Sequence, residues 1–577
     1  MSALDNAVRG ALARLGEQRF VQRLWDRDPS LWKSDPDHQR IIKNSLGWLT
    51  VPHQMLEHSH ELWRFADEVR GAGYKYAVVL GMGGSSLCPD VCRLTYGTAT
   101  GYLDLHVLDS TVPASVAKIE SAIDVATTIF VVSSKSGSTV EPLSFYKYFF
   151  ERVRQKKGGQ AGDNFVAITD PGTSLEKLAR EQRFRHIFPG QPDIGGRYSA
   201  LSNFGMVPAA LSGVEISALL SRAVEMASAC SQGTPLLENP GVVLGALLAE
   251  ANRVGRNKIT FVMSAGIYSF GDWVEQLIAE STGKDGKGLV PVVREYISTP
   301  DAYGNDRIFV HMSLASEKKR MVENRLTELE AAGHPVVKIE LADKYDLGKE
   351  FFRWEIATAT VGALLEINPF DQPNVQESKD NTNSFLAEFR AHGKLAVSQP
   401  LAEFEGVDFF CGYQQEGGDS AVPVQTGESG GACLASFLSQ ARPGDYLAIL
   451  PYLELSSAHK AAVQTFRLQL RDGLHLATTV GYGPRYLHST GQLHKGGPSS
   501  GLFILITADD KQDEPVPGEP FTFSVLKQAQ ALGDFEALRS RGRPVIRFHL
   551  GRNIQAGLDH VSSFVKTAVA KLQQGSE

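Results

Sequence analysis

Short apolar runs alternate with amphipathic stretches over most of this 577-residue chain, and this alternation restricts its fold more than any other feature. Strands that alternate with helices predict parallel, doubly wound sheets, whose ligand loops lie at the carboxyl ends of the strands. The first 70 residues have a mainly helical pattern instead, and a chain of this length is expected to form two or three domains. In the first half, the predicted strands are residues 76–80, 103–108, 128–132 and 164–169.

A loop of small hydroxyl residues, Ser-Ser-Lys-Ser-Gly-Ser-Thr at 133–139, joins the third of these strands to a predicted helix over 143–153. A turn of this kind directs unpaired backbone N–H groups outward, beside the positive end of the helix dipole. That arrangement binds anions, and the compact charge of Lys135 suits a phosphate monoester better than a planar carboxylate. The alternative is an ordinary helix cap with spare serines.

Two further loops carry paired glycines. Residues 81–86 (Gly-Met-Gly-Gly-Ser-Ser) follow the first strand, but they match neither the dinucleotide-binding nor the Walker spacing, so a tight structural turn is the alternative. In residues 193–199 (Asp-Ile-Gly-Gly-Arg-Tyr-Ser), the glycines allow close backbone approach while Arg197 faces a developing negative charge. The alternative for Arg197 is a solvated surface side chain.

Charge and composition narrow the choice of ligand and location. A net charge of -7 and a pI near 6.1 give no overall attraction to nucleic acid or to anionic membranes, so a phosphate site must be locally positive. No apolar run approaches the roughly 20 residues of a membrane span, and residues 1–12 lack the apolar core of a secretory signal. The five cysteines are expected to be reduced thiols without a zinc site, which predicts a cytoplasmic protein.

Five motifs together resemble the phosphoglucose isomerase family, which is built from two sugar-isomerase (SIS) domains. The three loops resemble that family's first glycine loop, its phosphate loop and one of its signature segments. Two further motifs lie downstream, and the five together cover roughly residues 45–380. They are Glu-Ser-Thr-Gly-Lys at 280–284, similar to the segment that carries the catalytic base, and Asn-Pro-Phe-Asp-Gln at 368–372 continuing to Lys379, similar to the second signature.

The sequence also departs from the family pattern. Asn374 stands where Gly or Ala is usual, and Gln376 replaces the usual Glu. The catalytic histidine normally follows the base by a few tens of residues, yet the interval from Glu280 to Lys379 offers only His311 and His334, neither in a matching context.

A matching histidine context appears near the C-terminus instead. Residues 487–492, Leu-His-Ser-Thr-Gly-Gln, resemble the family's histidine loop, which makes His488 the candidate and His494 its main competitor. The strand and helix predicted upstream, at 446–452 and 456–471, resemble the segment that normally leads into the base but lack the glutamate motif.

We therefore expect that part of the second domain is duplicated, with one copy keeping the glutamate and the other the histidine. The predicted fold class is α/β, with two doubly wound SIS domains, an N-terminal helical segment and an additional C-terminal α/β segment. The expected divisions are 1–235 (N-terminal helices and first SIS domain), 236–395 (second SIS domain) and 396–577 (the C-terminal segment). The polar, glycine-containing region 380–435 is expected to be an insertion or connection.

The resemblance implies a role for each site residue. Glu280 is implied to be the base, Arg197 to stabilise the enediolate, and His488 and Lys379 to open the sugar ring. No step requires a metal or a nicotinamide cofactor. The implied phosphate-binding residues are Ser85, Ser134, Lys135, Ser136 and Thr139, with Gly83, Gly84, Gly196, Gln372 and Glu141 in support.

The implied activity is the interconversion of glucose 6-phosphate and fructose 6-phosphate through a cis-enediol(ate), a step of glycolysis and gluconeogenesis. One alternative is an isomerase that also accepts mannose 6-phosphate, and another is a regulatory protein that binds phosphosugars without turnover. The sequence predicts neither a nucleic-acid nor a membrane partner. A homodimer is expected from the family. The chain is also similar to the isomerase portion of transaldolase–isomerase fusions, so an association or fusion with transaldolase is a further expectation.

Overall fold

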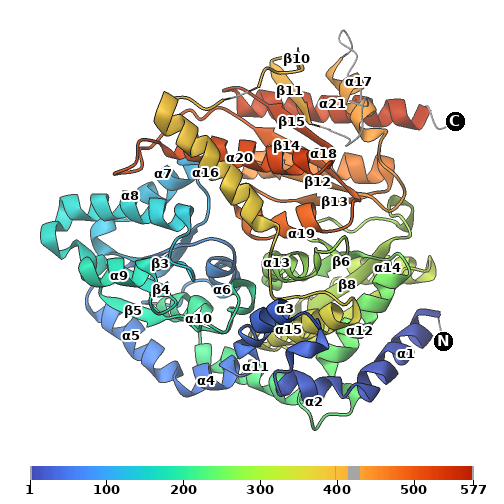
Figure 1. The fold of residues 1–577 in the computed structure, drawn as a ribbon, viewed down its shortest axis with the longest axis horizontal. Coiled ribbons are helices and arrows are strands. Elements are labelled where there is room, and N and C mark those ends of the chain that lie inside the picture. Colours follow the sequence, from blue (N-terminus) through green and yellow to red (C-terminus); the bar gives the residue numbers. More distant parts are fainter. Residues whose placement is uncertain (1–2, 397, 413–428, 575–577) are drawn as a thin grey trace.

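The computed structural model describes residues 3–396, 398–412 and 429–574, and its strands form three sheets, each flanked by helices. In Figure 1 the first sheet lies in the blue-to-teal part of the chain, the second in the green-to-yellow part and the third in the orange-to-red part. We call the surrounding segments the first unit (59–211), the second unit (240–364) and the third unit (402–412 and 429–574). The predicted α/β fold with an N-terminal helical segment and an extra C-terminal α/β segment is confirmed.

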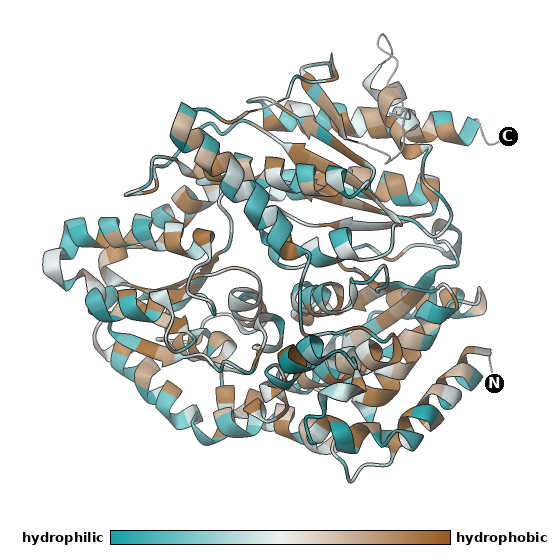
Figure 2. Cartoon of the chain, in the orientation of Figure 1, coloured by the Kyte–Doolittle hydropathy of each residue, from teal (hydrophilic) through white to brown (hydrophobic). Residues whose placement is uncertain are grey.

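The first sheet is parallel, in the order β2-β1-β3-β4-β5. The apolar runs β1, β3 and β4 are buried almost throughout because helices cover both faces, and Figure 2 shows hydrophobic strands beneath helices with hydrophilic outer faces. All four predicted strands are present, within one residue at each end. The elements are β1 (Tyr76–Leu80), β2 (Asp104–Leu108), β3 (Thr128–Ser133), β4 (Phe165–Thr169), β5 (His186–Pro189), α5 (Ser59–Gly71), α6 (Leu87–Tyr96), α7 (Pro113–Ala122), α8 (Val140–Lys157), α9 (Ser174–Glu181) and α10 (Asn203–Leu211).

The second and third sheets share one strand order. The second is β7-β6-β8-β9, and the third contains β13-β12-β14-β15, in each case with all strands parallel. Two antiparallel strands, β10 and β11, extend the third sheet beyond β15. The strands are β6 (Lys258–Met263), β7 (Val290–Val292), β8 (Arg307–Leu314), β9 (Val336–Leu341), β10 (Ala402–Phe404), β11 (Val407–Gly412), β12 (Tyr446–Pro451), β13 (Ala477–Val480), β14 (Gly501–Thr507) and β15 (Val545–His549).

The helices of these two units follow the same order along the chain with one exception. Helix α19 lies between β13 and β14, whereas the fully described segment between β7 and β8 contains no α-helix. The helices are α12 (Pro240–Arg253), α13 (Phe270–Thr282), α14 (Arg320–Ala331) and α15 (Leu347–Leu364) in the second unit, and α17 (Gly430–Leu438), α18 (Ser457–Leu474), α19 (Gly491–Gly496), α20 (Phe523–Ser540) and α21 (Ile554–Gln574) in the third.

The N-terminal helical segment packs against the loop that carries Arg197. Trp48 is fully buried, and its ring stacks on Tyr198 with the centroids 5.4 Å apart. Trp32 donates its indole N–H to the carbonyl of Ala359 at 2.8 Å, as expected of a buried tryptophan. The remaining helices are α1 (Ala3–Glu17), α2 (Phe20–Trp25), α3 (Pro36–Lys43), α4 (Val51–Glu57), α11 (Ile216–Ala229) and α16 (Val375–His392).

The second and third units meet along a charged and fully buried contact. Arg307 and Glu295 of the second unit form an ion pair at 3.2 Å. From the third unit, Arg467 donates to the carbonyl of Val293 at 2.9 Å and Thr478 donates to Glu295 at 2.8 Å. The two hydrogen bonds cross the contact, and separating the units would leave their buried polar groups without these partners, which costs free energy.

The region from 380 to 435 is more regular than its composition indicates. Helix α16 continues to His392, and β10 and β11 follow it. The glycine-containing residues 414–418 lie outside the described part of the chain. Among the described helices, none combines the length and the apolar character needed to span a membrane.

Candidate active site

A polar pocket of about 350 Å³ lies where the carboxyl ends of β1 and β3 face α13 and residues of the third unit. Nearly all of the predicted site residues line it, although they come from all three units, from α16 and from the segment that precedes α16. Glu141 does not line the pocket but contacts His488, which does. The predicted residues in the lining are Gly83, Gly84, Ser85, Ser134, Lys135, Ser136, Thr139, Gly196, Arg197, Glu280, Gln372, Lys379 and His488.

The serine loop joins β3 to the N-terminus of α8, as its sequence predicts. Its hydroxyls contact one another, with Ser134 donating to Thr139 at 3.2 Å. Lys135 forms an ion pair with Asp170, which directly follows β4. Buried Ser133 also lines the pocket, and no described residue pairs with its hydroxyl. Because buried polar groups are normally hydrogen-bonded, this orphaned hydroxyl points to a bound ligand as its partner.

The glycines of the first loop are required by packing. A Cβ atom on Gly84 would lie 2.0 Å from the carbonyl oxygen of Gly196. Gly83 has a φ of +56°, and a Cβ there would lie 2.7 Å from the carbonyl oxygen of His488. Because these two glycines lack side chains, residues 81–86 can pack against residues 193–199 and against the histidine loop, although the three loops belong to different parts of the chain.

Arg197 is buried, and its guanidinium donates hydrogen bonds to neighbouring groups of the protein. It donates to the hydroxyl of Ser281 at 2.6 Å and to the side-chain oxygen of Gln372 at 3.0 Å. Two more bonds go to the carbonyl oxygens of Pro369 and Asp371. Its guanidinium lies 3.6 Å from a carboxylate oxygen of Glu280, so a positive and a negative group face the same space.

Glu280 lies in the last turn of α13. Gln276, one turn earlier on the same helix, forms a hydrogen bond to its carboxylate. The amide nitrogen of Gln276 donates to Glu280 at 3.0 Å and to the carbonyl oxygen of His488 at 2.8 Å. The buried amide oxygen of Gln276 lines the pocket and finds no partner among the described residues. A second orphaned acceptor, Oδ1 of Asp170, also belongs to the lining. Such acceptors suit a ligand rich in hydroxyl groups.

His488 pairs with Glu141 of the first unit, with its Nε2 2.9 Å from the carboxylate. Burial raises the pKa of Glu141, but the charges of His488 and Lys379 outweigh it and hold that pKa below its usual value. The competitor His494 does not line the pocket. Burial, with Lys495 beside it, lowers the pKa of His494 to about 3.

The second signature lies at the rim of the pocket. Gln372 and Lys379 are exposed, and Lys379 lies in the first turns of α16. The substitution at 374 coincides with a contact to the third unit, because the backbone N–H of Asn374 donates to the side-chain oxygen of Gln492 at 2.9 Å. Gln376 points away and donates to Asp380 at 2.8 Å.

Sequence reasoning missed Asp170 and Gln276 as lining residues, and it included Ser133 in the anion-binding loop without giving it a role. Each had a usable signal. Ser133 opens the serine loop, Asp170 directly follows a predicted strand, and Gln276 precedes Glu280 by one helical turn, which places both side chains on one face.

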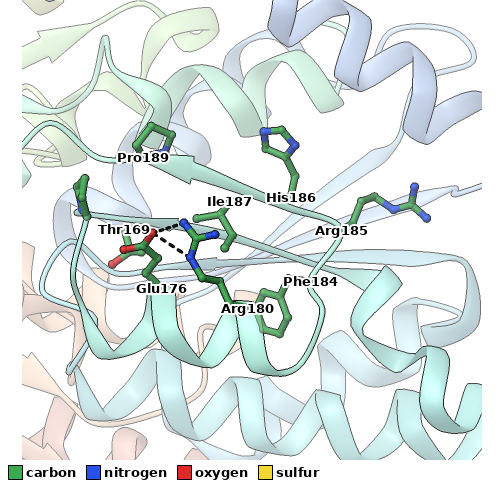
Figure 3. A pocket seen from close by; sticks show the side chains of 9 residues that line it. Thr169, Glu176, Arg180, Phe184, Arg185, His186, Ile187 and Pro189 are labelled. Atoms are coloured by element: carbon green, nitrogen blue, oxygen red, sulfur yellow. Dashed lines mark hydrogen bonds and ion pairs between the residues drawn. The ribbon is translucent and has the colours of Figure 1, made fainter.

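A second cavity, of about 430 Å³, lies beside the edge strand β5 (Figure 3). Its charged side chains are already engaged, since Glu176 pairs with Arg180 at 2.6 Å and Arg185 bonds the carbonyl oxygen of Asp163 at 2.8 Å. The described lining of this cavity does not place a carboxylate beside an anion-binding loop. The pocket at Glu280 does, so it is the better candidate for an active site.

The fold and the pocket are those of an α/β protein with a candidate site for a polyhydroxy anion at the carboxyl ends of β1 and β3. The sequence pattern of the family described as phosphoglucose isomerase matches residues 54–306. A glucose-6-phosphate isomerase from Carboxydothermus hydrogenoformans is 30% identical over 399 residues, which cover 60% of this chain and 85% of that protein. This chain belongs to the phosphoglucose isomerase family.

Solved structures agree on the fold. The hypothetical protein TT0462 from Thermus thermophilus is 25% identical and superposes with a TM-score of 0.56, covering 67% of this chain and 98% of its own. A glucose-6-phosphate isomerase from Chlamydia trachomatis is 21% identical, with a TM-score of 0.50 over 64% of this chain and 78% of its own.

Proposed function

We propose that this protein interconverts glucose 6-phosphate and fructose 6-phosphate by proton transfer between C1 and C2. One observation carries the proposal. The serine loop, the Glu280 carboxylate, the Arg197 guanidinium and the His488–Glu141 pair converge on one pocket. A protein that only binds phosphosugars needs the serine loop. It does not need the Glu280 carboxylate to be held beside the Arg197 guanidinium.

The serine loop anchors the substrate phosphate beside the N-terminus of α8, and Ser85, Ser134, Ser136 and Thr139 supply hydroxyl donors. Binding the remote phosphate positions the reacting carbons, and such positioning can be worth several powers of ten in rate. Lys135 adds a positive charge and is paired with Asp170.

Asp170→Asn is expected to tighten phosphosugar binding. The change removes a negative charge beside the anion and releases Lys135, while the amide retains an acceptor oxygen, so we expect about a threefold to tenfold lower KM. Inorganic phosphate should inhibit more strongly by the same factor. Asp193→Asn is the matched control, because Asp193 pairs with Arg27 at 3.0 Å and does not line the pocket. Unchanged or weaker binding in the Asp170 variant would contradict this role.

Glu280 removes the proton from C2 of the aldose or C1 of the ketose and returns it to the other carbon. Gln276 fixes one carboxylate oxygen of Glu280, and Arg197 faces the negative charge that develops as the enediolate forms. His488 and Lys379 assist ring opening, in which one proton reaches the ring oxygen and another leaves the anomeric hydroxyl. Glu141 holds the His488 ring through the contact to its Nε2.

Several expectations stay predictions. The equal strand order of the second and third sheets supports the proposal that residues 396–577 contain a partial duplicate of the second SIS domain, with divisions near 235 and 395. A homodimer, an association with transaldolase and a cytoplasmic location rest on resemblance or composition alone.

The proposed function is tested with the full chain. Purified protein given fructose 6-phosphate is expected to produce glucose 6-phosphate, followed through a coupled glucose-6-phosphate dehydrogenase assay. Mannose 6-phosphate is given in parallel and its product followed separately. Binding of fructose 6-phosphate without turnover would overturn the proposal and favour the regulatory alternative.

A further inference from the structure

We propose that Gln530, on α20 of the third unit, is a positioning residue that holds the Glu141–His488 pair in its working geometry. This inference rests on the proposed function. The amide nitrogen of Gln530 donates to Oε1 of Glu141 at 2.7 Å, the same oxygen that His488 contacts at 2.9 Å. Gln530 does not line the pocket, so it acts through Glu141 and His488.

The orientation of the Gln530 amide is determined by its neighbours. A carboxylate only accepts hydrogen bonds, so the amide nitrogen must face Glu141. The amide oxygen then faces Thr111, whose hydroxyl donates to it at 2.7 Å. Gln530 is 2% exposed, which leaves water little access to either bond. The result is a fixed chain from Thr111 through Gln530 and Glu141 to His488.

Two donors on one oxygen of Glu141 have a chemical consequence. They stabilise the ionised carboxylate in a buried place, where desolvation favours the neutral acid. They also fix the direction in which Glu141 meets His488, so that Nε2 faces the carboxylate and Nδ1 remains for the sugar. Without Gln530, the carboxylate of Glu141 would keep its charge partners but lose the bond that orients it.

Helix α20 also connects this pair to the rest of the site. One turn beyond Gln530, Asp534 accepts hydrogen bonds from Tyr486, which directly precedes the histidine loop, at 2.5 Å and from Ser378 at 3.1 Å. Ser378 directly precedes Lys379. Asp534 is also paired with buried Lys495 at 2.6 Å. The same helix therefore holds the two groups that we assign to ring opening.

The test compares Gln530→Leu with Gln530→Glu over pH 5.5–9. Gln530→Leu removes the donor and is expected to lower kcat about tenfold at every pH, the equivalent of one oriented hydrogen bond, with KM within about twofold of wild type. Gln530→Glu introduces a carboxyl group that can donate to Glu141 only while it is protonated. Facing another carboxylate, it has a raised pKa.

We therefore expect Gln530→Glu to retain most of its kcat at the acid end and to lose it progressively as pH rises and the new group ionises. The other titratable or charged groups around this contact are Glu141, His488, Lys379, Tyr452, Tyr486, Asp534 and Lys495, and they are present in every variant. Gln464→Glu is the control. Gln464 donates to the carbonyl of Arg294 at 3.2 Å, does not line the pocket, and should leave the wild-type pH profile unchanged.

Thr111→Val keeps Gln530 but frees its amide, and it should lower kcat by a smaller factor, which provides a second route if Gln530→Leu folds poorly. Thermal unfolding of each variant identifies such a folding defect. A Gln530→Glu profile parallel to wild type, or a loss confined to KM, would overturn the proposal. If wild type lacks turnover altogether, the proposed function has failed instead, which separates the two outcomes.

Discussion

Replacing Glu280 with Gln is expected to lower kcat about a thousandfold, the usual contribution of a general base, and to leave phosphosugar binding within a few-fold of wild type. The amide has the shape of the carboxylate and can still accept the hydrogen bond from Gln276, so the pocket should remain formed. What it loses is the basicity needed to remove a carbon-bound proton. The measurement pairs steady-state turnover of fructose 6-phosphate with calorimetric binding of the same sugar.

Glu275→Gln is the matched control, because Glu275 is also buried on α13 but does not line the pocket. Burial, with the Asp272 charge beside it, raises the pKa of Glu275 to about 8, so the amide replaces a group that is mostly neutral at pH 7. Its kcat should stay within about twofold of wild type. Equal losses in the two variants would show that Glu280 acts through structure and would remove it as the base.

Replacing His488 with Ala is expected to lower kcat about a hundredfold, because Glu141 then loses the group through which it assists ring opening. The substrates are cyclic in water, so a defect in ring opening reduces turnover even though Glu280 is intact. Phosphate binding should be retained, since the serine loop belongs to the first unit.

His494→Gln provides the comparison for His488. His494 is buried outside the pocket, with its pKa lowered to about 3, so its replacement should affect thermal stability more than kcat. A variant of His488 with full activity would exclude the third unit from the chemistry.

Local sequence patterns predicted most of the fold and the loops of the site. The strands β1, β3 and β4 are continuous apolar runs, and small residues directly follow β1 and β3, so both the sheet and its ligand edge could be located. β5 was not predicted, because this short edge strand has a partly exposed pattern and ends in Pro189.

Contacts between distant residues were beyond such patterns. Gly84 resembles a ligand-binding glycine, yet its lack of a side chain serves the close approach of Gly196. The pairing of Lys135 with Asp170 depends on the order of β3 and β4 in the sheet. Gln530 lies 389 residues from Glu141, and α20 offers no motif that marks it. These relations follow from how three sheets pack, which no local pattern contains.

The shared strand order of the second and third sheets has a consequence for how the site assembles. When two parts of a binding site lie on separate molecules, mass action separates them on dilution. Here the histidine loop and α13, which carries Glu280, belong to one polypeptide, so dilution does not separate them. The approach of these two segments to each other is thus a unimolecular event.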